Sequence, residues 1–298
     1  MANLFDYLKW RGDLSWEQTP LNEIDSLILS RLSYLPFDGI VPSSFTEVIS
    51  VSDAAKQFLH KEGAAEQLIM KTDLPFLQEV ANSDRFNKLG LCGYTNQVKL
   101  DEEKQFAAMV IHLLPDLSYV SYRGTDLSLA GWKEAFNMSF CTPIPAQKEA
   151  VRYLNCVAPN LTGQLIVGGH SKGGNLSVYS SAYCESQIQD RIKVIYNMDG
   201  PGFDASVLAS EGYQRIAAKI RTFIPQSSVV GMLLQHEEDY FVIQSRQIGL
   251  MQHDLFSWVV DGDEFVYLDE VTGGSKFIDS TLKTWLASLS LEQREEFV

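Results

Sequence analysis

Positive charge and long hydrophobic runs are both scarce in this sequence. Its 298 residues carry 24 Lys and Arg against 38 Asp and Glu, a formal net charge of −14. Nucleic-acid binding needs a basic surface facing the phosphates, and electrostatic docking on anionic membranes needs basic segments, so this charge argues against both. No apolar stretch is long enough to cross a bilayer. With 45% hydrophobic and 21% charged residues, the chain is expected to be globular.

Cysteine is scarce as well. The four that occur show neither a CxxC pair nor the spacing of metal ligands: Cys92, Cys141, Cys156 and Cys184. The first residues soon reach Lys9 and Arg11, so no hydrophobic signal-peptide core is expected there. We therefore expect free thiols in a reducing compartment, and with them a cytoplasmic location.

What is present divides into a helical first part and a later alternation of strands and helices. Residues 1–90 are expected to be mostly helical, with helices over 22–34, from Ser52 onward and from Asp73 onward. The expected strands are 106–114, 118–122, 164–168, 192–196, 220–224, 240–245, 257–260 and 264–268. The expected later helices are 147–157, 175–184, 206–219 and 277–289.

This alternation predicts an α/β fold, with a mostly parallel central sheet and helices on both faces. No repeat or low-complexity linker separates the two parts. We therefore expect one continuous domain, in which a helical segment over 1–90 packs on a core over 91–298. Ligands of such sheets bind beyond the carboxyl ends of the strands.

The most informative motif lies at one such strand end. Gly169-His170-Ser171-Lys172-Gly173 reads G-x-S-x-G and stands between an apolar, strand-like segment and a helical one. A serine on so sharp a turn is held with its hydroxyl exposed, and the flanking glycines avoid collisions with the neighbouring strand and helix. We predict Ser171 to be a nucleophile. The alternative is a glycine-rich turn that only changes the direction of the chain.

A serine hydroxyl needs a general base and an acid that orients the base. In folds with this turn, the order along the chain is serine, acid, histidine. Beyond Ser171 the histidines are His236 and His253. His253 falls in a late loop, where the base belongs, and is preferred. His236 precedes a run of acids and is expected to be a solvated surface residue.

Asp199 is the favoured acid because it ends the strand that follows the serine. A carboxylate at the end of the next parallel strand can reach the imidazole and fix its tautomer. The alternative is that Asp199 only caps its own Asp-Gly-Pro turn. Asp239 and Asp254 stay open as candidates in less suitable contexts.

An oxyanion hole is expected from two segments. One donor is the backbone N–H of Lys172, the residue after the nucleophile. The other comes from Tyr122-Arg123-Gly124-Thr125-Asp126, where Gly124 lets the backbone approach the substrate and Thr125 offers its N–H and hydroxyl. Arg123 and Asp126 are expected to pair and hold this loop.

Segments 122–126, 131–132 and 169–174 together resemble the filamentous-fungal triacylglycerol lipases and their class 3 relatives. Those carry an aromatic-R-G-T/S segment, a downstream Trp and a G-H-S-L-G-G turn. The resemblance implies an α/β-hydrolase fold, Ser171 as nucleophile, and Thr125 with Lys172 at the oxyanion hole. Over nearly its full length the chain resembles more closely a largely uncharacterised bacterial lipase-like family of that superfamily. The segments that carry this second resemblance are 22–25, 230–234 and 252–254.

Three departures from the lipase pattern matter. Lys172 replaces an apolar residue, which is expected to put a charge at the mouth of the site. Class 3 lipases take their acid from a D-x-V-P segment after a later strand, where this chain has Ser227 and Ser228. This favours Asp199, whose D-G-P-G-F setting is similar to the acid of pancreatic-type lipases. Finally, residues 130–140 either form an apolar flap over the substrate or pack on the sheet.

These features predict a serine hydrolase that cleaves small-molecule or lipid esters through an acyl-enzyme, with no metal or organic cofactor. The competing interpretation is a binding or scaffold protein that kept the fold and lost turnover, because no carboxylate stands near Ser227. A thioesterase, acyltransferase or peptidase would use the same triad and differ only in substrate. The motifs leave open the acyl length and the oligomeric state.

Overall fold

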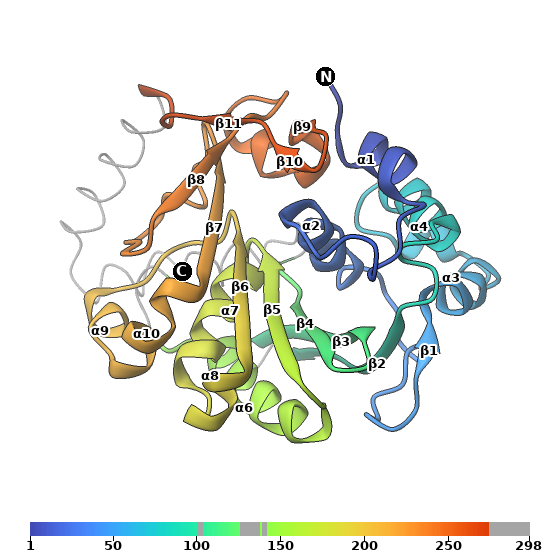
Figure 1. Ribbon diagram of the computed structural model, residues 1–298, viewed down its shortest axis with the longest axis horizontal. Helices are drawn as coiled ribbons and strands as arrows, with labels where there is room; N and C mark the ends of the chain where they lie inside the picture. Colours follow the sequence, from blue (N-terminus) through green and yellow to red (C-terminus); the bar gives the residue numbers. More distant parts are fainter. Residues whose placement is uncertain (100–103, 126–137, 139–141, 274–298) are drawn as a thin grey trace.

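A computed structural model describes residues 1–99, 104–125, 138 and 142–273 (Figure 1). Within these residues, nine strands form one sheet in the order β1-β2-β3-β4-β5-β6-β7-β8-β11. Strands β4 to β8 run parallel, while β1 to β3 extend one edge and β11 the other in antiparallel pairs. Their bounds are β1 Ile49–Ser50, β2 Gly90–Lys99, β3 Lys104–Leu114, β4 Leu117–Tyr122, β5 Gln164–His170, β6 Ile192–Met198, β7 Ile220–Pro225, β8 Tyr240–Ile243 and β11 Tyr267–Leu268. Strands β9 (Val260–Asp261) and β10 (Glu264–Phe265) form a separate hairpin.

Helices cover both faces of this sheet (Figure 1). One face carries α1 (Leu4–Arg11), α2 (Glu23–Leu32), α3 (Val51–Leu59) and α4 (Asp73–Asn82). The other carries α6 (Pro145–Val157), α7 (Lys172–Tyr183), α8 (Ser186–Arg191), α9 (Ala205–Leu208) and α10 (Glu211–Ile216).

Alternation along the strands builds two hydrophobic cores. On β5, Ile166 belongs to the core beneath α2, while Leu165 and Val167 belong to the core beneath α6 and α7. Successive side chains of a strand point to opposite faces, so the buried strand is apolar on both. The expected α/β class is confirmed: the chain has a mostly parallel central sheet with helices on both faces.

Pairing between distant segments overrides the local pattern at three places. Strand β2 is absent from the sequence prediction, because its register shifts between Cys92 and Thr95 and breaks the regular alternation. Within the strand expected at 257–260, Ser257 ends a 3-10 turn and Trp258 forms an isolated bridge to Ser245, so β9 begins only at Val260. The strand expected at 264–268 divides between β10 and β11, which belong to different sheets.

Two helix predictions also need correction. The helix expected over 206–219 is broken, because Ser210 accepts the N–H of Tyr213 and starts a new helix, α10, after α9 ends. The helix expected from Ser52 begins one residue earlier, with Ser50 as its N-cap. The helix expected over 277–289 lies outside the described residues.

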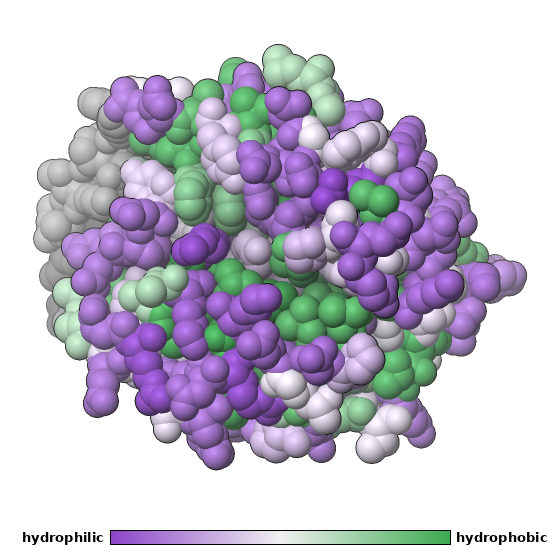
Figure 2. All heavy atoms as spheres, viewed as in Figure 1, coloured by the Kyte–Doolittle hydropathy of each residue, from purple (hydrophilic) through white to green (hydrophobic). Residues whose placement is uncertain are grey.

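The surface and the thiols agree with the composition. Figure 2 shows hydrophilic side chains over most of one face, with apolar ones gathered toward its middle. In the described part of the chain, no helix combines the length and the apolar character that crossing a membrane requires. The cysteines within the described residues are free: Cys92, Cys156 and Cys184.

Two buried ion pairs tie the first helices together. The Arg85 guanidinium donates to both oxygens of Asp25, at 2.8 and 2.6 Å, and both side chains are fully buried. Asp25 also accepts the Tyr7 hydroxyl at 2.7 Å, so its carboxylate serves several elements at once. Arg31 of α2 donates its Nε to Asp73 of α4 at 2.8 Å. These contacts hold α1, α2 and α4 in one arrangement on the sheet.

Breaking the first pair is expected to destabilise the protein strongly. Asp25→Asn leaves the Arg85 charge buried without its counter-charge, which costs about 3–5 kcal/mol. Urea unfolding measures this loss. The matched control is Asp53→Asn, since Asp53 is 58% exposed in its pair with Lys56, and such pairs contribute little. Equal unfolding midpoints for the two variants would contradict the assignment.

Candidate active site

Ser171 stands on a sharp turn between β5 and α7. Its φ is +61°, which is uncommon for a non-glycine residue, and it is 9% exposed. A Cβ on Gly169 would lie 2.4 Å from the backbone of Gly173, and a Cβ on Gly173 would lie 2.1 Å from the carbonyl oxygen of Tyr122. Strand, turn and helix therefore pack this closely only with glycine at both positions.

The loop after β4 lies against this turn. A Cβ on Gly124 would lie 3.0 Å from Ser171 Cβ and 2.6 Å from the carbonyl oxygen of His170. Thr125 Oγ1 is buried and finds no hydrogen-bond partner among the described residues. Lys172 is the first residue of α7, so its N–H points out of the helix start beside Ser171. The backbone at Gly124 and the start of α7 therefore both lie beside the serine.

Asp199 and His253 are brought together from the end of β6 and from the 3-10 turn Gly249–His253. His253 Nδ1 lies 2.7 Å from Asp199 Oδ2. The Asp199 side chain is 1% exposed, whereas 24% of the His253 side chain is exposed. The buried carboxylate thus orients an imidazole that remains accessible on its other side.

His253 is held near Ser171 through His170. The ring of His170 contacts the backbone of His253, with Nε2 at 2.9 Å from the carbonyl oxygen, and the two ring centroids are 4.6 Å apart. Within the described residues the hydrogen bonds of His253 run to Asp199 and His170, and a bond to the Ser171 hydroxyl is not among them. In enzymes without substrate such a bond is often long and tightens when the substrate binds.

His170, the residue before the serine, has a role that its motif position does not reveal. Its Nε2 faces a carbonyl oxygen and so carries a proton, while Nδ1 lies 3.0 Å from the Tyr34 hydroxyl. Burial, aided by the neighbouring His253, lowers the pKa of His170 well below its ordinary value. A neutral His170 therefore links Tyr34 to the backbone of His253.

Ser228 is the second residue that sequence reasoning missed. It lies in the segment where class 3 lipases carry their acid, and its hydroxyl donates to Asp199 Oδ1 at 2.5 Å. The same hydroxyl accepts the Gly231 N–H at 2.9 Å. The sequence signal was present, but a serine in that segment suggested only a missing carboxylate.

His236 does not join this cluster, and the expectation that it is solvated is wrong. Its side chain is 5% exposed and lies 3.0 Å from Glu238 Oε1, because the segment after β7 folds back over β7 and α10. Of the other acids considered, Asp239 is exposed and Asp254 accepts the N–H of Phe256. Neither makes the contact with His253 that Asp199 makes.

The expected charge at the mouth of the site also needs correction. The Lys172 side chain is 1% exposed, and its ammonium donates to the carbonyl oxygen of Gln105 at 2.7 Å. The chain thus solvates this charge internally. Within the segment 130–140, Met138 is buried in the core beneath α6 and α7. The rest of that segment, and Asp126 of the expected pair with Arg123, lie outside the described residues.

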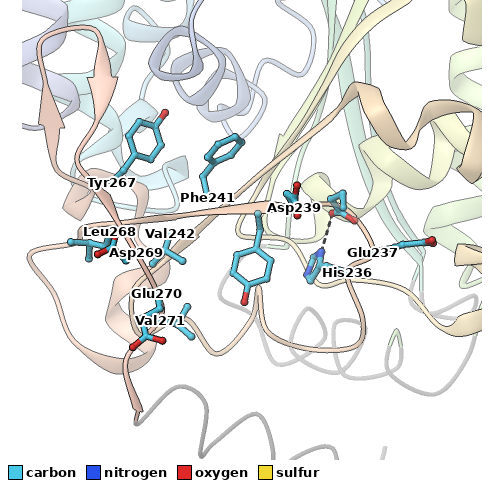
Figure 3. Close-up of a pocket in the computed structure, with 12 residues that line it drawn as sticks. His236, Glu237, Asp239, Phe241, Val242, Tyr267, Leu268, Asp269, Glu270 and Val271 are labelled. Atoms are coloured by element: carbon cyan, nitrogen blue, oxygen red, sulfur yellow. Dashed lines mark hydrogen bonds and ion pairs between the residues drawn. The ribbon is translucent and has the colours of Figure 1, made fainter.

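Two cavities in the described part of the chain lie away from this cluster. One, of about 850 Å³, opens between residues 236–242 and 267–271 (Figure 3). The other, of about 530 Å³, lies near the amino ends of the parallel strands, beside Leu117 and Val194. Neither is lined by Ser171, Asp199 or His253. No three His, Cys, Asp or Glu side chains of the described residues are arranged to hold a metal ion.

A comparison with family models gives one match. The Mbeg1-like model matches residues 80–298, well over half of the chain. The chain belongs to the Mbeg1-like family. This agrees with the expected resemblance, since in family and fold the chain is a lipase-like α/β-hydrolase. No curated protein matches it.

Several solved structures are similar to this Mbeg1-like chain. M37 lipase shares 13% identity over 70% of this chain and 69% of its own, with a TM-score of 0.42. A mutant form of MDLA from Penicillium cyclopium shares 14% over 70% and 78%, with a TM-score of 0.43. Lip2 lipase from Yarrowia lipolytica shares 12% over 64% and 84%, with a TM-score of 0.40.

The buried His170 predicts how stability depends on pH. Below the ordinary histidine pKa of 6.5, the unfolded chain binds a proton at residue 170 that the folded chain refuses, so stability falls as the pH drops. His170→Gln should be less stable than wild type near pH 7.5 and should lose less stability between about pH 7 and pH 5. Urea unfolding at several pH values measures both slopes. His60→Gln, at an exposed histidine, is the control, and a slope for His170→Gln equal to wild type would overturn the neutral assignment.

Proposed function

We propose that this protein is a serine hydrolase that cleaves carboxylic esters of lipids or small acyl compounds, with Ser171, His253 and Asp199 as its triad. The observation that carries the proposal is the 2.7 Å contact between His253 Nδ1 and the buried Asp199, formed beside a serine on a strained turn. A structural turn alone needs no such pair. The same proposal includes a cytoplasmic location, which the free thiols of Cys92, Cys156 and Cys184, within the described residues, support.

The reaction begins at the serine hydroxyl. His253 accepts the Ser171 proton at Nε2, because Nδ1 donates to Asp199 and this fixes the tautomer. The serine oxygen attacks the ester carbonyl, and the negative charge that develops on the carbonyl oxygen meets the N–H groups of Thr125 and Lys172. The imidazolium then protonates the leaving alcohol. Water activated by His253 releases the acid and restores the serine.

Burial makes Asp199 effective in this scheme. A carboxylate shielded from water interacts strongly with the positive charge that His253 gains during the reaction. His170 and Ser228 hold the base and the acid from two sides through bonds of 2.9 and 2.5 Å. The chemistry asks for no group beyond these side chains and the two backbone donors.

Labelling with a fluorophosphonate probe, followed by intact-mass analysis, tests the nucleophile. Wild type should gain one adduct, and Ser171→Ala should gain none. His253→Ala and Asp199→Asn should slow labelling by orders of magnitude, since the activating pair is lost. His236→Ala should still label, because His236 lies outside the cluster. Absence of an adduct on folded wild type would favour the binding or scaffold interpretation.

The oxyanion donors give a second prediction. Thr125→Val keeps the backbone N–H and removes the hydroxyl, so it should lower kcat only if the hydroxyl holds the oxyanion, by about 10²-fold. Gly124→Ala should nearly abolish turnover, because its Cβ would lie 2.6 Å from the His170 carbonyl oxygen. Rates with aryl esters of graded acyl length measure both effects. Full activity of Gly124→Ala would contradict the placement of this loop beside the reacting carbonyl.

A further inference from the structure

A second histidine–carboxylate pair lies buried beneath the candidate site. His236 Nδ1 lies 3.0 Å from Glu238 Oε1 (Figure 3), and their side chains are 5% and 3% exposed. Glu238 also accepts the hydroxyls of Thr222, at 2.6 Å, and Tyr213, at 2.5 Å. The mechanism above uses none of these four side chains.

The partners of the His236 ring fix its orientation. The Gly231 carbonyl oxygen can only accept and lies 2.7 Å from Nε2, so Nε2 carries a proton. Nδ1 lies 3.0 Å from Glu238 Oε1. Burial raises the pKa of Glu238, but its hydrogen bond and charge interaction with His236, with the two hydroxyls, bring that pKa down to about 2.

From His236 a continuous path of hydrogen bonds leads to the acid. The ring donates to the Gly231 carbonyl, and the Gly231 N–H donates to Ser228 Oγ at 2.9 Å. The Ser228 hydroxyl in turn donates a hydrogen bond to Asp199 Oδ1 at 2.5 Å. The other Asp199 oxygen, Oδ2, faces His253. Each link donates toward Asp199, so Ser228 holds Oδ1 and leaves Oδ2 to His253.

The close packing around the Asp199 carboxylate also requires a glycine at position 231. A Cβ on Gly231 would lie 2.3 Å from Asp199 Oδ1 and 3.2 Å from Ser228 Oγ. Asp199 itself has φ +53° and 1% exposure, so it has no water shell to orient it. The loop after β7 can therefore approach the Asp199 carboxylate this closely only with glycine at position 231. From the same loop, the Ser228 hydroxyl donates to that carboxylate.

We propose that His236, Gly231 and Ser228 form a positioning relay, which fixes the Asp199 carboxylate so that Oδ2 faces His253. The relay rests on the proposed function, because it acts only through Asp199. None of its members touches substrate. Glu238 anchors the far end by holding the His236 ring in place through its contact with Nδ1.

Ser228→Ala tests the relay at its last link. Without the hydroxyl, the carboxylate can rotate away from His253, so kcat should fall about tenfold while KM stays unchanged. The acid limb of the pH–rate profile should move to lower pH, because an unfixed carboxylate stabilises the imidazolium less. Ser227→Ala is the matched control, since the Ser227 hydroxyl bonds Thr272 Oγ1 instead. It should leave both readouts at wild-type values.

A second measurement does not depend on turnover. Imidazole NMR of the full-length protein reports the Nδ1 proton of His253 in its bond to Asp199. This resonance should broaden in Ser228→Ala and in Gly231→Ala, and should stay sharp in Ser227→Ala. His236→Gln should broaden it as well, whereas His60→Gln should not. Thermal melts of each variant identify any that fail to fold.

The outcomes separate the relay from the proposed function. A wild type that labels and turns over, with Ser228→Ala equal to Ser227→Ala in rate, pH profile and NMR, overturns the relay and leaves the triad intact. An acid limb that moves to higher pH also overturns it, since the hydroxyl would then act by dispersing charge. A wild type that does not label overturns the proposed function, and the NMR comparison still decides whether Ser228 holds Asp199.

Discussion

Parallel pairing of β4 to β7 aligns the ends of four strands in one row, and every group of the candidate site except His253 follows from that row. The register places Tyr122 opposite Gly169, His170 opposite Met198, and Met198 opposite Phe223. Each strand therefore ends within a residue or two of its neighbours, and the Gly124 loop, Ser171, Asp199 and the Ser228 loop leave the sheet side by side. A shift of one residue in any of these pairings would turn the side chains to the other face.

The second constraint is the cost of burying charge. Asp199, His236 and Glu238 are all removed from water, and each is satisfied by named donors or acceptors within hydrogen-bond distance. An unpaired charge at these depths would be strongly destabilising. His170 avoids this cost because burial keeps its ring neutral. Its two ring nitrogens bond the Tyr34 hydroxyl and the His253 carbonyl oxygen. The result is that a neutral imidazole holds His253 and a neutral hydroxyl holds the Asp199 carboxylate.

The positions of Asp199 and Ser228 differ from the class 3 lipase pattern in one respect: a serine stands where that pattern has a carboxylate. The class 3 acid segment follows a later strand, and Ser228 stands there with its hydroxyl 2.5 Å from the Asp199 carboxylate. Two adjacent strand ends therefore meet at one carboxylate, since Asp199 contacts both Ser228 and His253. In the sequence, Ser228 suggests a missing carboxylate. In the structure, its hydroxyl donates to the carboxylate of Asp199, which follows the adjacent strand.

The sequence by itself determined the α/β class and the strand–turn–helix around Ser171, because these depend on local periodicity and on glycines at a sharp turn. It also limited the candidates for the proposed base to His236 and His253. Only the tertiary structure decided which acid His253 contacts, that His236 is buried, and that Lys172 points inward to Gln105. It also decided that His170 contacts His253 and that Ser228 contacts Asp199. Those contacts join segments from different strands and loops. Residues so far apart in the chain come into contact only when the sheet register and the packing of both faces are set. A local sequence pattern therefore cannot predict these contacts.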